Sequence, residues 1–112
     1  MMWRHVLKEP AIPTQSAALL CVDLPGYGGS DSFERYDSAV LEALTEYIIA
    51  MREKFGVDEQ GSEMRTYVVG HDWGCVLAFR LASEAPCLAD RFILTNGPHV
   101  RSPFGSWFVL SC

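Results

Sequence analysis

Residues 67–75 read Tyr-Val-Val-Gly-His-Asp-Trp-Gly-Cys. The aromatic and β-branched residues at the start favour a strand, which we predict over 65–69. Two glycines then enclose a turn, because glycine adopts backbone conformations that other residues avoid. A helix is expected over about 75–85, since Pro86 cannot continue one. The stretch therefore predicts a strand, a glycine-flanked turn and a helix, with Asp72 at the centre of the turn.

This arrangement is that of a nucleophile elbow, Gly-x-nucleophile-x-Gly, in which a side chain at either glycine is expected to collide with the nucleophile or with neighbouring strands. Asp72 occupies the position where Ser is usual. A carboxylate is ionised at pH 7, so it can attack a saturated carbon, such as an epoxide carbon or one bearing a halide, without a base. The simpler alternative is that Asp72 only caps the helix that follows. The two glycines and the preceding strand favour the elbow.

Outward from the elbow, apolar strands alternate with helices. The apolar run 17–22 predicts a strand buried on both faces, and the glycine-rich stretch 24–30 predicts a tight turn. An amphipathic helix is expected over 37–54, and a further strand over 92–95. This alternation predicts an α/β fold, a three-layer α/β/α arrangement with a mostly parallel sheet.

Composition excludes several classes of function. A net charge of -5 with scattered basic residues makes nucleic acid an unsuitable partner. Neither a signal peptide nor a membrane-spanning run is visible, and a cytoplasmic location is expected. The four cysteines lack Cys-x-x-Cys spacing, so no zinc site or redox motif is predicted. Cys21 and Cys75 are expected to be small buried thiols.

Three motifs in this order resemble the epoxide hydrolases of the α/β-hydrolase superfamily, and some haloalkane dehalogenases. They are Gly-His-Asp-Trp-Gly at 70–74, Asp-Leu-Pro-Gly-Tyr-Gly-Gly-Ser-Asp at 23–31 and Asn-Gly-Pro-His at 96–99. The resemblance implies that Asp72 is the nucleophile, that the Trp73 backbone N–H is an oxyanion donor, and that the Trp73 side chain faces the substrate. It also implies hydrolysis of a small apolar epoxide or haloalkane with no metal and no cofactor.

The resemblance further implies parts that these residues do not match. An upstream His-Gly-x-Pro segment would precede residues 3–4, and the base His and its acid partner would follow a cap domain. Another strand would lie between 17–22 and 65–69. We therefore expect 1–102 to be an incomplete α/β-hydrolase core, without N-terminal strands, cap or C-terminal strands, and 103–112 to be an unmatched tail. Such a chain is expected to be incomplete as a catalyst and marginally stable.

Several alternatives remain open. His99 follows a strand at the end where such sheets bind ligands, and we expect it to line the pocket or to be structural rather than to replace the base. His71 is expected to pack or to form hydrogen bonds within the elbow. The runner-up activity is that of a haloalkane dehalogenase, and the non-enzymatic alternative is a truncated remnant. The sequence leaves the physiological substrate and the oligomeric state undetermined.

Overall fold

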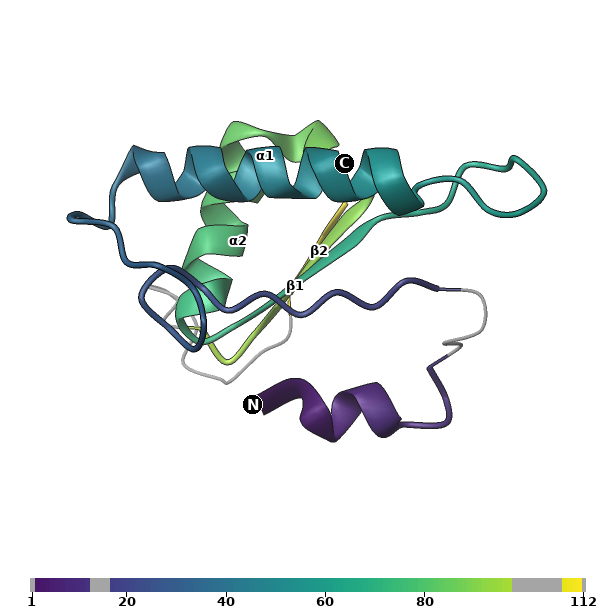
Figure 1. The fold of residues 1–112 in the computed structure, drawn as a ribbon, viewed down its shortest axis with the longest axis horizontal. Helices are drawn as coiled ribbons and strands as arrows, with labels where there is room; N and C mark the ends of the chain where they lie inside the picture. The colour runs from purple at the N-terminus through teal and green to yellow at the C-terminus, as the bar shows by residue number, and fades with distance from the viewer. Residues whose placement is uncertain (1, 13–16, 98–107, 112) are drawn as a thin grey trace. The chain divides into compact units, whose positions relative to one another are not determined.

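The computed structural model describes residues 2–12, 17–97 and 108–111. The chain divides into two compact units, Met1–Phe33 and Glu34–Cys112. All strands and both α-helices of the described residues belong to the second unit (Figure 1).

In its described residues, the first unit contains two short helical turns, η1 (Met2–Arg4) and η2 (Val6–Lys8), and no strand. The strand predicted over 17–22 is wrong, because these residues adopt neither helix nor strand. A strand satisfies its backbone groups only beside a partner strand, and no described strand pairs with this segment. Residues 18–22 are exposed, with Leu20 at 46%. Cys21 is exposed as well, so the expectation of a buried thiol there is also wrong.

The glycine-rich stretch of this unit forms the predicted tight turn, built around Asp23. The Asp23 carboxylate accepts a hydrogen bond of 3.1 Å from the Gly29 backbone N–H, and the Ser30 hydroxyl donates to the Asp23 carbonyl at 2.6 Å. Gly28 has φ +54°, and a Cβ there would meet the Asp23 carboxylate. Only glycine therefore combines this backbone conformation with this close approach.

The sheet of the second unit has the order β1-β2-β3. Strands β1 (Tyr67–His71) and β2 (Arg91–Thr95) are parallel and confirm the predicted strands, although the first lies two residues further along than expected. Strand β3 (Phe108–Ser111) pairs antiparallel with β2 and was not predicted. The parallel pair joined by a helix confirms an α/β fold, while β3 makes the described sheet a mixed one.

Helix α2 (Trp73–Glu84) connects the two parallel strands and packs against both (Figure 1). It ends before Pro86, as predicted. Phe92 and Leu94 lie two positions apart on β2, hence on one face, and are 1% and 2% exposed. Residues of α2 are buried with them: Cys75, Leu77, Ala78 and Leu81. Burial of a large apolar side chain such as Phe92 stabilises the fold by roughly 1.5–3 kcal/mol.

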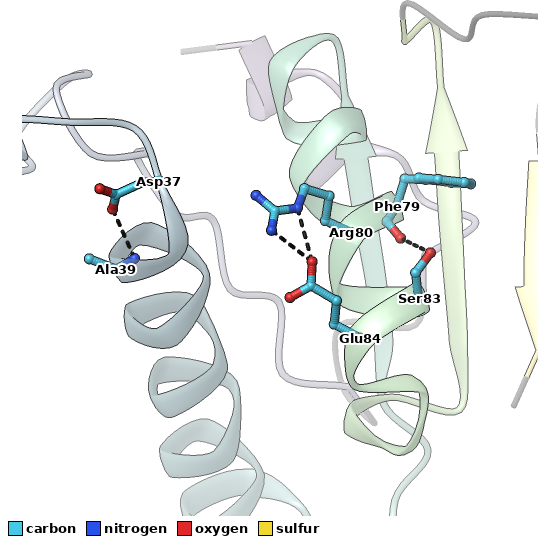
Figure 2. Close-up of polar contacts among 6 residues, drawn as sticks. All are labelled: Asp37, Ala39, Phe79, Arg80, Ser83 and Glu84. Carbon is cyan, nitrogen blue, oxygen red and sulfur yellow. Dashed lines mark hydrogen bonds and ion pairs between the residues drawn. The ribbon is translucent and has the colours of Figure 1, made fainter.

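Helix α1 (Ser38–Phe55) confirms the predicted amphipathic helix. The Asp37 side chain caps its start by accepting a 3.1 Å hydrogen bond from the Ala39 N–H (Figure 2). At its end the Gly56 N–H donates to the Arg52 carbonyl at 2.7 Å. A Cβ at Gly56 would collide with that carbonyl, so the glycine is needed for close approach, while its φ of -77° is ordinary.

Helix α1 packs against α2 and against η3 (Pro86–Leu88). The Arg52 guanidinium strengthens this contact by donating to the carbonyls of Cys87 and Leu88, at 3.0 Å each. The described part of the chain thus has α2 on the sheet and α1 on α2, and helices on both faces of the sheet remain a prediction. No helix among the described residues has the length and apolar character needed to cross a membrane.

Candidate active site

Asp72 lies at the turn between β1 and α2, as the sequence predicts. Its backbone has φ 53° and ψ -120°, a conformation that residues other than glycine rarely adopt. Such strain costs on the order of 1–3 kcal/mol and persists only where the surroundings impose it. The Asp72 side chain is exposed and makes no hydrogen bond to the helix amides. The alternative that Asp72 serves only to cap α2 is therefore wrong.

The end of β2 holds this turn in place. The Asp72 N–H donates to the Thr95 carbonyl at 3.3 Å, which continues the ladder between the parallel strands by one residue. On the other side of the turn, the Cys75 N–H donates to the Asp72 carbonyl at 2.9 Å. The backbone of Asp72 is thus fixed on both sides while its carboxylate faces outward.

The flanking glycines differ from one another. A Cβ on Gly70 would meet the Gly74 carbonyl and, at 3.0 Å, the Ala78 Cβ, so Gly70 allows α2 to approach β1. A steric reason for glycine at position 70 was predicted correctly. The collision, however, is with α2 and not with the nucleophile or a neighbouring strand. A Cβ on Gly74 would meet nothing within 4 Å among the described residues. The expected collision at Gly74 is therefore wrong.

Gly97 is a third glycine of the site, which the sequence identifies as part of the 96–99 motif but not as a neighbour of Cys75. A Cβ at Gly97 would collide with the side chain of Cys75 and would lie 3.7 Å from the Asp72 carbonyl oxygen. The Asn-Gly-Pro sequence signals a turn, yet nothing local to it identifies Cys75 as the neighbour. This contact joins residues that lie far apart in the sequence.

Cys75 is buried beneath the turn, as expected. Burial raises the pKa of the Cys75 thiol, backbone hydrogen bonds with Gly97 and Thr95 oppose this, and the charge of Asp72 raises it further. A thiol kept protonated is a poor nucleophile. The exposed carboxylate of Asp72 is thus the better nucleophile of the two.

Trp73 begins α2 with its side chain 57% exposed. Its backbone N–H belongs to the first turn, whose amides have no acceptor within the helix, and the positive end of the helix dipole adds to its attraction for anions. Its predicted role as oxyanion donor is not contradicted by this position and stays a prediction. His71 is half-buried at the end of β1, opposite Thr95. His99 lies outside the described residues, and its role also stays a prediction.

Comparisons with known proteins identify the family. A family model described as alpha/beta hydrolase fold matches residues 2–110. The chain belongs to the alpha/beta hydrolase fold family. Within the described residues of this hydrolase chain, no group of three or more His, Cys, Asp or Glu side chains is placed to hold a metal ion.

Several curated relatives resemble this hydrolase chain. It is 33% identical over 97 residues to AB hydrolase superfamily protein YfhM of Bacillus subtilis, covering 87% of this chain and 31% of the relative. It is 33% identical over 100 residues to epoxide hydrolase 1 of Caenorhabditis elegans, covering 89% and 22%. It is 36% identical over 90 residues to epoxide hydrolase A of Mycobacterium tuberculosis, covering 80% and 24%. The hydrolase chain thus matches less than a third of the length of these relatives, and no solved structure matches it.

Proposed function

We propose that this chain carries the nucleophile of an epoxide hydrolase-like enzyme and that the nucleophile is the Asp72 carboxylate. The observation that carries the proposal is the backbone of Asp72, which is held at φ 53° while its side chain makes no hydrogen bond to the helix. None of the described contacts of Asp72 makes this strain useful for the stability of the fold. Residues with strained backbones of this kind cluster at active sites.

The proposed first step needs only a carboxylate and an epoxide. A carboxylate oxygen of Asp72 forms a bond to one epoxide carbon while the bond from that carbon to the ring oxygen breaks. The ring oxygen takes a proton from solvent and becomes a hydroxyl group. The product is a hydroxyalkyl ester of Asp72, and no base is required because the carboxylate is already ionised.

The second step is hydrolysis of that ester. Water adds to the ester carbonyl, and N–H donors hold the negative charge on its oxygen. The backbone N–H of Trp73, at the start of α2, is the donor that we propose from this chain. We propose no residue of this chain as the base that activates the attacking water. Release of the diol is therefore proposed only for the whole protein.

The named relatives favour an epoxide over a haloalkane. Epoxide hydrolase is the name of relatives from several organisms, including epoxide hydrolase 4 of Mus musculus and epoxide hydrolase 3 of Xenopus tropicalis. Each is covered by this chain over only 24% of its length. The substrate class is therefore proposed from names that belong to longer proteins.

The test is a covalent labelling experiment on the purified chain. Wild type and Asp72→Asn are each incubated with an aryl epoxide and, separately, with a primary bromoalkane, and intact masses are recorded together with halide release and diol formation. The amide of Asp72→Asn keeps the size of the side chain but is not a nucleophile at pH 7, so it is the matched control.

We expect one equivalent of epoxide on wild type and none above background on Asp72→Asn. Alkylation of wild type by the bromoalkane alone, with halide release, would favour the dehalogenase activity instead. Equal labelling of both proteins, or no labelling by either reagent, would contradict the proposed function. Diol at many equivalents per chain would show that this chain also completes the second step.

A further inference from the structure

The floor of the Asp72 turn is a contact between the start of α2 and the end of β2. Cys75 occupies the third position of α2 and is buried. Gly97 approaches it so closely that even a single added Cβ would overlap both the Sγ and the Cβ of Cys75. The space between these two residues therefore admits one small side chain and no more.

The same two segments also fix the backbone of Asp72. Thr95 accepts from the Asp72 N–H, while Cys75 donates its own N–H to the Asp72 carbonyl. That carbonyl oxygen lies 3.7 Å from the position of a Cβ on Gly97. A change in the spacing between Cys75 and Gly97 must therefore shift the peptide groups on which the unusual φ of Asp72 depends.

We propose that Cys75 is a positioning residue for Asp72, seated against Gly97 so that the spacing between α2 and β2 holds the carboxylate in its attacking conformation. This proposal rests on the proposed function for its catalytic meaning, although the geometry it asserts can be tested without any reaction. Cys75 acts through packing and does not contact the substrate.

The chemistry of the Cys75 thiol agrees with a packing role. A thiol of ordinary pKa 9.0 is already protonated at neutral pH and burial raises the pKa of Cys75 further, so it does not compete with Asp72 as a nucleophile. Its size is what the contact uses, because a Cys side chain fills a small buried space as an apolar group would. A serine at position 75 has nearly the same size and is the conservative variant.

The experiment adds a Cβ at position 97 and then removes the side-chain atoms of Cys75 with which that Cβ collides. Gly97→Ala adds the collision, and Cys75→Gly combined with Gly97→Ala removes the two atoms involved. Gly29→Ala is the control, since a Cβ there meets nothing within 4 Å. Two quantities are measured in the full chain: amide hydrogen exchange at Asp72 and Cys75 relative to α1, and the rate of Asp72 esterification by an aryl epoxide at saturation.

In Gly97→Ala we expect the exchange at Asp72 and Cys75, relative to α1, to rise about tenfold and the esterification rate to fall about tenfold, because overpacking shifts the turn. The double variant should return to within about threefold of wild type on both measures. Gly29→Ala and Cys75→Ser should match wild type.

The proposal is overturned if Gly97→Ala exchanges at Asp72 and Cys75 like wild type, or if the double variant recovers neither measure. Should Gly97→Ala fail to fold, the double variant decides: recovery supports the contact, and failure refutes it. If wild type is not esterified at all, the proposed function fails, while the exchange ratios still decide whether Cys75 positions Asp72.

Discussion

Asp72 and Asn96 have the same unusual backbone dihedral angle, φ 53°, and each directly follows one of the two parallel strands. Asn tolerates this region better than most residues, because its short amide can form local hydrogen bonds. Asp72 has no such hydrogen bond to the amides of α2. Both residues lie at the carboxyl ends of the parallel strands, which is the end where open α/β sheets bind ligands.

Replacement of Asp72 by glycine should stabilise the chain. Glycine relieves strain of about 1–3 kcal/mol at this φ and loses part of that gain, roughly 0.5–1 kcal/mol, to greater freedom when unfolded. We expect a net increase of about 1 kcal/mol in the free energy of unfolding, measured by urea denaturation. Asp31→Gly, outside the positive-φ positions, is the control and should lose stability. A less stable Asp72→Gly would show that the turn is not strained.

The Cys75 thiol should make stability depend on alkaline pH. Burial, the largest cause, raises its pKa above the ordinary value of 9.0 in the folded chain. The folded state therefore holds this proton more tightly than the unfolded state, so the stabilising contribution is complete below pH 9 and is lost as pH rises through the folded pKa. Urea denaturation between pH 7 and 10 should show this loss in wild type and less of it in Cys75→Ser. Identical pH profiles would contradict the assignment.

Whether a helix or strand could be predicted from the sequence depended on whether its stabilising contacts are local or join distant parts of the chain. The β1–turn–α2 unit and α1 were predictable, because glycine positions, helix periodicity and the cap by Asp37 are local signals. The strand over 17–22 failed because an apolar run becomes a strand only beside a partner. Strand β3 was not predicted, because its short apolar run becomes a strand only through antiparallel pairing with β2, which the run itself does not signal. The Cys75–Gly97 contact, between distant segments, had no local signal.

Gly70→Ala should destabilise the packing of β1 against α2. The added Cβ would meet the Gly74 carbonyl and the Ala78 side chain, both in α2, and overpacking of this kind costs about 1–3 kcal/mol. Urea denaturation followed by circular dichroism measures the loss. Gly74→Ala is the matched comparison in the same motif, because a Cβ there meets nothing within 4 Å. Equal losses in the two variants would refute the close approach at Gly70.

At the scale of the whole molecule, the chain is short for its family. It covers 31%, 22% and 24% of the length of the relatives from Bacillus subtilis, Caenorhabditis elegans and Mycobacterium tuberculosis. In the described residues β1 is an edge strand, with Tyr67 and Val69 exposed at 48% and 46%. An exposed apolar edge is a template for pairing with other chains.

We therefore expect the purified chain to be marginally stable and to self-associate. Net stabilities of domains are only about 5–15 kcal/mol, and the free N–H and C=O groups of an edge strand can pair with the edge of another chain. Size-exclusion chromatography should show oligomers at micromolar concentrations, and urea unfolding should be broad. A monomer that unfolds cooperatively with several kcal/mol of stability would contradict this expectation.

One site-resolved measurement tests most directly whether Asp72 is the nucleophile. After reaction with an aryl epoxide, trypsin cleavage at Arg65 and Arg80 releases a peptide of residues 66–80, which contains Asp72 together with His71 and Cys75. Fragmentation of this peptide by mass spectrometry locates the adduct. We predict an ester on Asp72, cleaved by hydroxylamine and absent from Asp72→Asn. An adduct on His71 or Cys75 with none on Asp72 would contradict the assignment of Asp72 as the nucleophile.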